Sequence, residues 1–391
     1  MSHERPILVV GGGIAGLALA LGLARHGREV VVLESRSEFE TAGAGIQLGA
    51  NGVRVLQSLG VADHLAAAVG APEAIRIFNG RSAASLASLP LGAWFRARHG
   101  APYWTMHRGD LHRALVQAAN SEPRILLRPG SALAAVRQEP DQVIATDGGG
   151  SRLAGAALVG ADGLWSAVRQ ALFPRLKPLL VGATAARTVL SAGRAGRLAG
   201  PHVGLWLGPG ANVVHYPVRG GSEVAVVIIA RQHGQANGWD TRVDTGAALK
   251  PIATFHPELT EVLSAADDYR QWSLYRLTGL PHWCVGRVGL IGDAAHPVLP
   301  HLAQGGALAL EDALRLAALL ADAGDDVAAK LRQFEAERRP RATTIEALSH
   351  RNGRLYHLMP PWSWARNWVL RSLSGAWLMA GYDSLYGWRP H

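Results

Sequence analysis

The hydrophobic pattern at the start of the chain predicts a strand, a helix and a second strand. Residues 7–10 are apolar and run into a cluster of glycines, residues 14–26 carry apolar side chains at helical spacing, and residues 29–33 are again rich in valine. The glycines interrupt the apolar stretch, so it does not fit the uninterrupted core of a secretory signal peptide. A strand, helix and strand in this order predict a parallel sheet and an α/β fold.

The later pattern predicts two interleaved domains and a helical tail. Helical spacing at residues 306–323 follows a buried strand at 288–291, whereas short strands separated by glycine and proline between 179 and 278 favour an antiparallel sheet. We predict a Rossmann-like domain made of residues 1–72, 100–178 and 280–338, an antiparallel-sheet substrate domain made of 73–99 and 179–279, and a C-terminal helical segment at 339–391.

Composition narrows the possible functions. The chain has 391 residues, of which 48% are hydrophobic and 18% charged, so a large core is expected. The net charge of +9 comes without any basic run, and we therefore expect no nucleic-acid partner. Cys284 is the single cysteine, which excludes an intrachain disulfide and fits a reducing, cytoplasmic location.

Metal and membrane sites are not expected. His296 and His301 have no nearby cysteines or carboxylates in a metal-binding pattern, so we predict a site without metal. No segment offers about 18 uninterrupted apolar residues, as a membrane span would need. The tail carries five tryptophans, and we expect them to cover the substrate domain or a dimer contact, with a membrane-surface anchor as the less favoured alternative.

The glycine cluster has the spacing of a dinucleotide-binding fingerprint. Gly11, Gly13 and Gly16 follow the first strand and open the helix, and Glu34 ends the second strand. The glycines permit a tight turn, close approach of a pyrophosphate and close helix packing, while Glu34 can accept hydrogen bonds from a ribose. This fingerprint alone does not choose between NAD and FAD.

Further motifs resemble those of the group A FAD-dependent aromatic monooxygenases, the relatives of para-hydroxybenzoate hydroxylase. The motifs that carry the resemblance are Gly-Ala-Asp-Gly-Leu-Trp-Ser-Ala-Val-Arg at 160–169, Gly-Leu-Ile-Gly-Asp-Ala-Ala-His-Pro at 289–297, and shorter segments at 43–47, 107–111, 302–306 and 311–313. Within that family, residues 214–221 and 382–388 are similar to those of the salicylate, 3-hydroxybenzoate and 6-hydroxynicotinate hydroxylases.

The resemblance implies an FAD enzyme that uses NAD(P)H as a transient co-substrate and oxygen to hydroxylate a small phenolic or hydroxy-aromatic acid through a flavin C4a-hydroperoxide. No second glycine-rich unit is present to hold the nicotinamide. Two alternatives stay open: a reductase or epoxidase of the same fold that acts on a non-aromatic substrate, and a flavin-binding regulator without turnover. We expect a monomer or a homodimer.

The resemblance also implies which residues bind FAD. Asp293 would bind the ribityl chain, Arg108 would lie along the cofactor, and Asp162 would serve both FAD and NAD(P)H; a helix cap for Asp293 and a turn for Asp162 are the structural alternatives. The full predicted set is Gly11, Gly13, Ile14, Ala15, Gly16, Glu34, Ser35, Arg36, Gly45, Ile46, Gln47, Arg108, Asp162, Gly292, Asp293, Pro300, Gly305 and Gly306.

Three residues are predicted to take part in catalysis. His215 falls where related enzymes place a histidine that activates a phenol, although a strand histidine held by the backbone is the alternative. Pro300 and Gln304 would line the face on which oxygen and substrate meet, with helix capping as the alternative for Gln304. The strand at 223–226 lacks the asparagine usual in the family, which leaves the substrate open.

Overall fold

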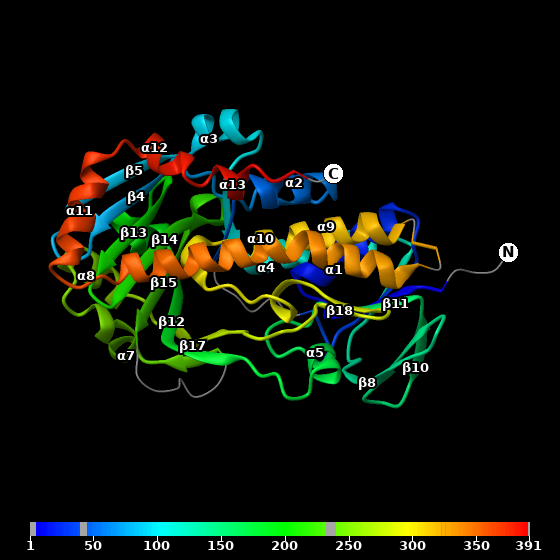
Figure 1. The fold of residues 1–391 in the computed structure, drawn as a ribbon. Coiled ribbons are helices and arrows are strands. Elements are labelled where there is room, and N and C mark those ends of the chain that lie inside the picture. The colour runs from blue at the N-terminus through cyan, green and yellow to red at the C-terminus, as the bar shows by residue number, and fades with distance from the viewer. Residues whose placement is uncertain (1–4, 40–44, 232–239, 322, 325, 390–391) are drawn as a thin grey trace.

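The computed structural model describes residues 5–39, 45–231, 240–321, 323–324 and 326–389. Gly43 and Ala44 of the family motif lie outside the described residues. Two sheets dominate the structure, and long helices run between and along them (Figure 1). This arrangement agrees with the predicted α/β fold with a helical C-terminal region.

The first sheet has a parallel core. Its strand order is β18 (Cys284–Val285), β19 (Val288–Leu290), β11 (Ala157–Gly160), β1 (Ile7–Val10), β2 (Val30–Leu33) and β7 (Ile125–Arg128). The pairs from β19 to β7 are parallel, and β18 pairs antiparallel with β19. Strands β1, β2, β11 and β19 are buried throughout, which explains their unbroken apolar sequences.

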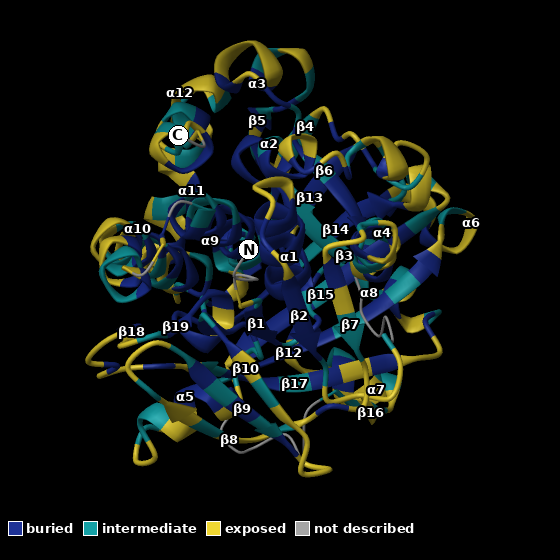
Figure 2. Ribbon diagram, turned by 90° about the vertical axis from the view of Figure 1, so that its right-hand side faces the viewer, coloured by how far each residue is buried: buried dark blue, intermediate teal, exposed yellow. Residues whose placement is uncertain are grey.

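Helices pack on this sheet and on one another, and they contribute to the main core. They are α1 (Ile14–Arg25), α2 (Ala50–Ser58), α4 (Arg108–Asn120) and α9 (Gly305–Ala321). A Cβ atom at Gly22 of α1 would lie only 2.8 Å from the Cβ of Ala317 in α9, so these two helices pack without an intervening side chain. Figure 2 shows α1, β1 and β2 as a continuous buried centre.

The second sheet has eight strands and is mainly antiparallel. Its order is β16 (Thr241–Val243), β17 (Tyr269–Arg276), β12 (Leu179–Ser191), β15 (Glu223–Arg231), β14 (Ala211–Val218), β13 (His202–Gly208), β4 (Ala74–Asn79) and β5 (Ser85–Pro90). Only the β13–β4 pair is parallel among the pairs described. Strands from two distant parts of the sequence therefore complete one sheet.

Smaller elements surround the two sheets. One three-stranded sheet contains β8 (Leu133–Gln138), β9 (Val143–Asp147) and β10 (Arg152–Gly155), and one ribbon pairs β3 (Gly45–Leu48) with β6 (Trp104–His107). The short helices are α3 (Gly92–His99), α5 (Ala167–Leu172), α6 (Ala192–Ala195), α7 (Thr245–Leu249) and α8 (Pro257–Ser264). The 3-10 turns are η1 (Asp63–Leu65), η2 (Gly196–Leu198), η3 (Arg219–Gly221), η4 (Lys250–Ile252), η5 (Gly292–Ala294) and η6 (Pro300–Leu302).

The C-terminal helices run back over the second sheet. They are α10 (Val327–Tyr356), α11 (Trp362–Ser372), α12 (Gly375–Ala380) and α13 (Asp383–Tyr386). The predicted boundary after residue 338 falls inside α10, which continues through Pro340. The C-terminal segment therefore starts as the second half of a helix that the first domain also uses.

Four of the five tail tryptophans are exposed and do not cover a core within the chain, so of the expected roles only a dimer contact stays a prediction for them. Trp362, Trp364, Trp368 and Trp377 are 65–71% exposed, although α11 and α12 pack against β5. Only Trp388 among the five packs against the main core. None of the helices in the described ranges is long and apolar enough to cross a membrane.

Candidate active site

The turn between β1 and α1 is open on the side where a phosphate would approach. Gly11 has a φ of +105°, and a Cβ there would lie 2.5 Å from the carbonyl oxygen of Ala161. A Cβ at Gly16 would lie 2.0 Å from the carbonyl oxygen of Gly11, so both positions require glycine. A Cβ at Gly13 would meet no atom within 4 Å. The backbone is therefore bare at the start of the helix, as binding of a pyrophosphate demands.

Glu34 lies at the end of β2 and holds this turn in place. Its Oε2 accepts a hydrogen bond of 2.8 Å from the amide of Gly12, and its Oε1 accepts one of 2.9 Å from the amide of Arg36. His112, in α4, contacts the carbonyl oxygen of Gly12 through Nε2 at 2.7 Å. His112 could not be predicted from the sequence, because a histidine on an ordinary helix belongs to no local motif.

Asp293 and Arg108 form the charged part of the same region. Asp293 lies in η5 and Arg108 begins α4, and both side chains reach solvent. Protein atoms nevertheless crowd the two groups: desolvation raises the pKa of Asp293, while the positive charge of Arg108 opposes this rise. Desolvation likewise lowers the pKa of Arg108, with Asp293 opposing. The two residues are close enough for their charges to interact, and both remain accessible to polar groups of a ligand.

Asp162 caps a helix and also keeps one oxygen free among the described residues. Its Oδ2 accepts a hydrogen bond of 3.1 Å from the amide of Val168 in α5, whereas Oδ1 is buried without a partner. Arg169 of the same helix donates to the carbonyl oxygen of Ala294 at 2.8 Å. The loop after β11 is thereby fastened to the turn that carries Asp293.

The start of α9 lies against the β3 ribbon. A Cβ at Gly306 would lie 2.7 Å from Cδ1 of Ile46, whereas a Cβ at Gly305 would meet nothing within 4 Å. The first amides of a helix have no partners inside the helix, and they present a partial positive charge. An anionic ring system lying over Ile46 would be stabilised there.

A buried polar network supports α9 from behind. Arg338 donates to Asp312 at 2.8 Å and to Glu311 at 2.7 Å, and Arg341 donates two further hydrogen bonds to Glu311. His296 contacts the other oxygen of Asp312. Desolvation would raise the pKa of Asp312, but the charges of His296 and Arg338 prevail and lower it. The network joins α9, α10 and the segment after η5.

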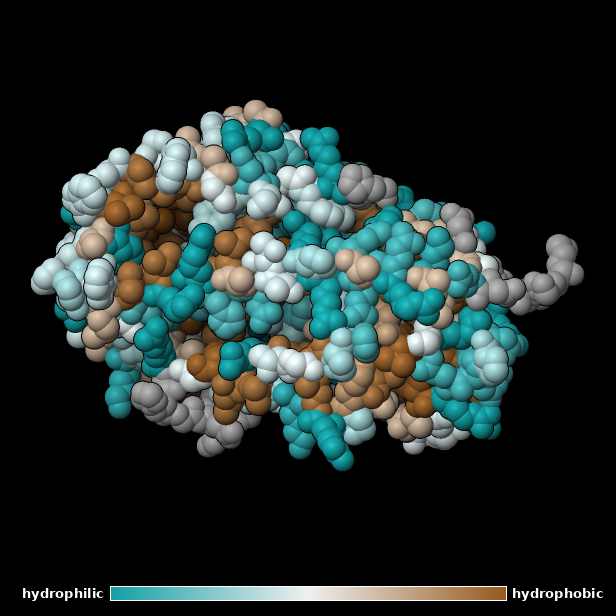
Figure 3. Space-filling view, viewed as in Figure 1, coloured by the Kyte–Doolittle hydropathy of each residue, from teal (hydrophilic) through white to brown (hydrophobic). Residues whose placement is uncertain are grey.

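A cavity of about 670 Å³ lies beyond the β3 ribbon. Strands β4, β13 and β14 form its floor, and α10, α11 and α12 form its walls. Gln47 and Pro300, both predicted to contact the cofactor, border it. Figure 3 shows a hydrophobic hollow at the upper left, framed by α10, α11 and α12.

Comparison with known proteins identifies the fold family. The family described as FAD binding domain matches residues 4–349. The chain belongs to the FAD binding domain family. It is 33% identical to a 3-hydroxybenzoate 6-hydroxylase of Klebsiella oxytoca, over 100% of this chain and 98% of the relative. It is 33% identical to a 6-hydroxynicotinate 3-monooxygenase of Bordetella bronchiseptica, over 90% of this chain and 92% of the relative.

A solved structure has the same fold. A salicylate hydroxylase in complex with its substrate superimposes with a TM-score of 0.84 and 23% identity, covering 100% of this chain and 97% of the other. The predicted fold, the FAD cofactor and the class of FAD-dependent aromatic monooxygenase are confirmed. The bare backbone at Gly13 and the exposed pair of Asp293 and Arg108 fit the binding of a dinucleotide that carries a flavin.

His215 does not lie where the prediction needs it. Successive side chains of β14 alternate between the two faces of the sheet, and Asn212 and Val214 border the cavity. His215 faces the opposite side, where it is 1% exposed and packs beside His202 and over Gly204. Burial, together with His202, lowers its pKa to about 3. The role of a phenol-activating base therefore does not fit the structure.

Gln304 and Pro300 occupy different environments. The side chain of Gln304 is buried and accepts a hydrogen bond of 2.9 Å from Asn51, which also donates to Glu311. It thus belongs to the buried network, whereas Pro300 borders the cavity. Asn51, Arg338 and Arg341 were missed by sequence reasoning, because each lies far in sequence from the acceptor that it binds.

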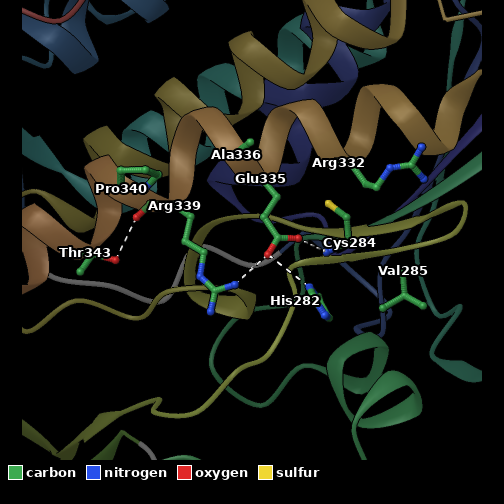
Figure 4. A pocket seen from close by; sticks show the side chains of 9 residues that line it. All are labelled: His282, Cys284, Val285, Arg332, Glu335, Ala336, Arg339, Pro340 and Thr343. Carbon is green, nitrogen blue, oxygen red and sulfur yellow. Dashed lines mark hydrogen bonds and ion pairs between the residues drawn. The ribbon is translucent and has the colours of Figure 1, made fainter.

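A second hollow lies outside this site, along α10. Figure 4 shows Glu335 at its centre, with Arg339, His282 and Cys284 around it. Glu335 accepts a hydrogen bond of 3.1 Å from the amide of Cys284 and pairs with Arg339 at 2.8 Å. Burial raises the pKa of the Cys284 thiol, so the thiol stays protonated and is a poor nucleophile. We assign no chemistry to this groove.

Proposed function

We propose that the protein hydroxylates an aromatic substrate bound in the cavity, with NAD(P)H as the electron donor and molecular oxygen as the oxidant. The observation that carries this proposal is the shared border: Gln47 in β3 and Pro300 in η6 lie between the elements that would hold the flavin and the cavity. Both relatives named above act on hydroxylated aromatic rings. Bound FAD would supply the electron transfer and the activation of oxygen.

Several residues of the chain would position the cofactor. Gly13 and the first turn of α1 would bind the pyrophosphate, Glu34 the ribose, and Asp293 with Arg108 the polar chain next to the flavin. The start of α9 would stabilise negative charge on the reduced ring through its free amides. The apolar cavity would exclude water from the reacting atoms.

Two polar side chains fix the border between flavin and substrate. Tyr103 donates a hydrogen bond of 2.9 Å to the Oε1 atom of Gln47. Tyr216, from β14, contacts Gly45 and is also hydrogen-bonded to Gln47. Two tyrosines thus hold the ribbon that carries Gln47, which would keep flavin ring and substrate in a constant relative position.

The test is oxidation of NADH or NADPH by the purified, FAD-loaded protein in the presence of phenolic compounds. We expect the rate to rise with an accepted compound and an oxygenated product to accumulate. A rate that no phenol changes, with hydrogen peroxide as the only product, would contradict the proposal.

The reducing equivalents that NAD(P)H provides also favour a cytoplasmic site of action.

A further inference from the structure

The cavity is larger and less polar than a single hydroxybenzoate ring requires. Its volume of about 670 Å³ lies in the middle of the range, about 300–1,000 Å³, that holds drug-sized ligands. Aliphatic side chains such as Ile77, Leu205 and Val214 form its floor, and Leu370 and Leu378 of the C-terminal helices face them. A ligand that fills this space must carry a substantial apolar part.

The cationic groups that line the cavity are poorly placed to hold a buried carboxylate. Arg351 is exposed on α10 at the rim. Arg366 donates hydrogen bonds of 2.8 Å to the carbonyl oxygens of Leu355 and Tyr356, and burial lowers its pKa to about 10. His301 is neutral at physiological pH, because burial lowers its pKa to about 4. Arg366 stays protonated at neutral pH, but its Nε, Nη1 and Nη2 atoms already donate to protein acceptors. A deeply bound anion would therefore have to compete with these acceptors for its N–H groups.

One polar group in the floor is poised to bind an oxygen. Asn212 is fully buried, its Oδ1 lies 2.8 Å from Nε2 of His357, and its Nδ2 has no partner among the described residues. An amide oxygen only accepts, so His357 donates through Nε2 and fixes the amide with its NH₂ group unpaired. A buried donor without a partner is costly unless a ligand supplies an acceptor.

We propose that the substrate is an uncharged phenol with a bulky apolar substituent, whose oxygen accepts a hydrogen bond from Asn212 while the substituent fills the cavity toward α11 and α12. This inference rests on the proposed function, since it names the class of ring that the same cavity would present for hydroxylation. His357 acts as a positioning residue, because it orients the amide and touches no substrate atom in this scheme.

The first test measures binding alone, with oxidised FAD-loaded protein and no electron donor. Changes in the flavin absorbance give dissociation constants for 3-hydroxybenzoate and for 4-alkylphenols from ethyl to octyl. Each methylene that enters the cavity should tighten binding roughly 3- to 4-fold, until the cavity is full. If 3-hydroxybenzoate binds as tightly as 4-butylphenol, or if chain length has no effect, the inference is wrong.

Variants on the two faces of β14 locate the contact. Asn212→Leu should weaken the binding of 4-propylphenol on the order of 10- to 100-fold and leave the binding of propylbenzene unchanged, because only the phenol loses a hydrogen bond. His357→Phe should give a smaller loss with the same selectivity. Val213→Ala, on the opposite face of the strand, serves as the matched control and should change the dissociation constant of neither ligand. Equal weakening of phenol and hydrocarbon by Asn212→Leu would overturn the role of Asn212.

A cavity-filling variant tests the apolar part separately. Val214→Phe fills part of the cavity above its floor, so the alkyl chain length that gives the tightest binding should become shorter. An unchanged optimal chain length would contradict the placement of the alkyl group in the cavity. Turnover distinguishes this inference from the proposed function. Hydroxylation of 3-hydroxybenzoate without binding of alkylphenols would refute the inference alone, whereas tight binding of alkylphenols without any oxygenated product would refute the function.

Discussion

The carboxylates behind α9 and the amide of Asn212 in the cavity differ in how many hydrogen-bond partners they have. Behind α9, Glu311 and Asp312 are saturated by Arg338 and Arg341. In the cavity, Asn212 is fixed by one partner and keeps its amide group free among the described residues. The first arrangement holds helices together, and the second leaves binding capacity for a ligand. At these two places, the number of hydrogen-bond partners distinguishes the supporting carboxylates from the amide that we propose to bind a ligand.

The largest effect should come from breaking the saturated network. Arg338→Leu would leave Asp312 and Glu311 buried with fewer partners, and removal of one partner of a buried ion pair costs about 3–5 kcal/mol. Urea unfolding of the FAD-loaded protein measures the change. Arg315→Leu is the control, since its pair with Glu337 lies near the surface, where ion pairs contribute about 0–1 kcal/mol. Equal losses in the two variants would contradict the importance of the network.

The next effect concerns the charged hollow at η5. Asp293→Ala should weaken FAD binding by about 1–3 kcal/mol, because cofactor hydroxyls would lose a charged acceptor. Titration of the apoprotein by flavin fluorescence gives the affinity. Asp267→Ala, with a carboxylate that is 80% exposed far from the turn, should bind FAD like the parent. Unchanged affinity in Asp293→Ala would remove Asp293 from the cofactor site.

A smaller effect should appear as the pH falls. Burial lowers the pKa of both His215 and His357 to about 3, against about 6.5 in an unfolded chain. Between pH 6.5 and 3 the unfolded chain binds protons that the folded chain does not, so each histidine lowers the free energy of unfolding by up to about 1.4 kcal/mol per pH unit. His215→Leu should therefore lose stability less steeply between pH 7 and 5. An identical slope in parent and variant would show that His215 is not buried neutral.

The smallest effect is expected on product formation when His215 is replaced. Because His215 faces away from the cavity, His215→Leu should leave the product formed per NAD(P)H consumed unchanged at matched FAD occupancy. Asn212→Leu, on the opposite face of the same strand, should lower that ratio. A poorly held substrate ring would leave the electrons to form hydrogen peroxide from oxygen. A selective loss of coupling in His215→Leu would restore this histidine to the mechanism.

The flavin half of the fold was predictable because its rules are local. One contiguous unit contains the spaced glycines, the strand before Gly11 and the carboxylate of Glu34. The unbroken apolar strands predict a parallel sheet. The partners of Glu311 were not predictable in this way. They depend on how α10 packs on α9, which no short motif records.

The substrate half was harder because a strand has two faces. In Ala211–Val218, polar and apolar residues occur on both sides, so alternation does not reveal which side meets the cavity. His215 was chosen for its chemistry, and the register places Asn212 in the cavity instead. The tail tryptophans show the same difficulty, since composition predicted only that they cover another surface, whereas Trp362 and Trp377 are exposed and line the cavity.

The most direct test of the account is a single turnover under ¹⁸O₂. FAD-loaded protein is reduced with NADH or NADPH in the presence of a 4-alkylphenol and then mixed with labelled oxygen, and the product is analysed by mass spectrometry. The account predicts one ¹⁸O atom in the hydroxylated ring, with a lower yield in Asn212→Leu than in the parent. A product without label would contradict it, as would reduced flavin that passes all its electrons to oxygen and forms only hydrogen peroxide with every phenol tested.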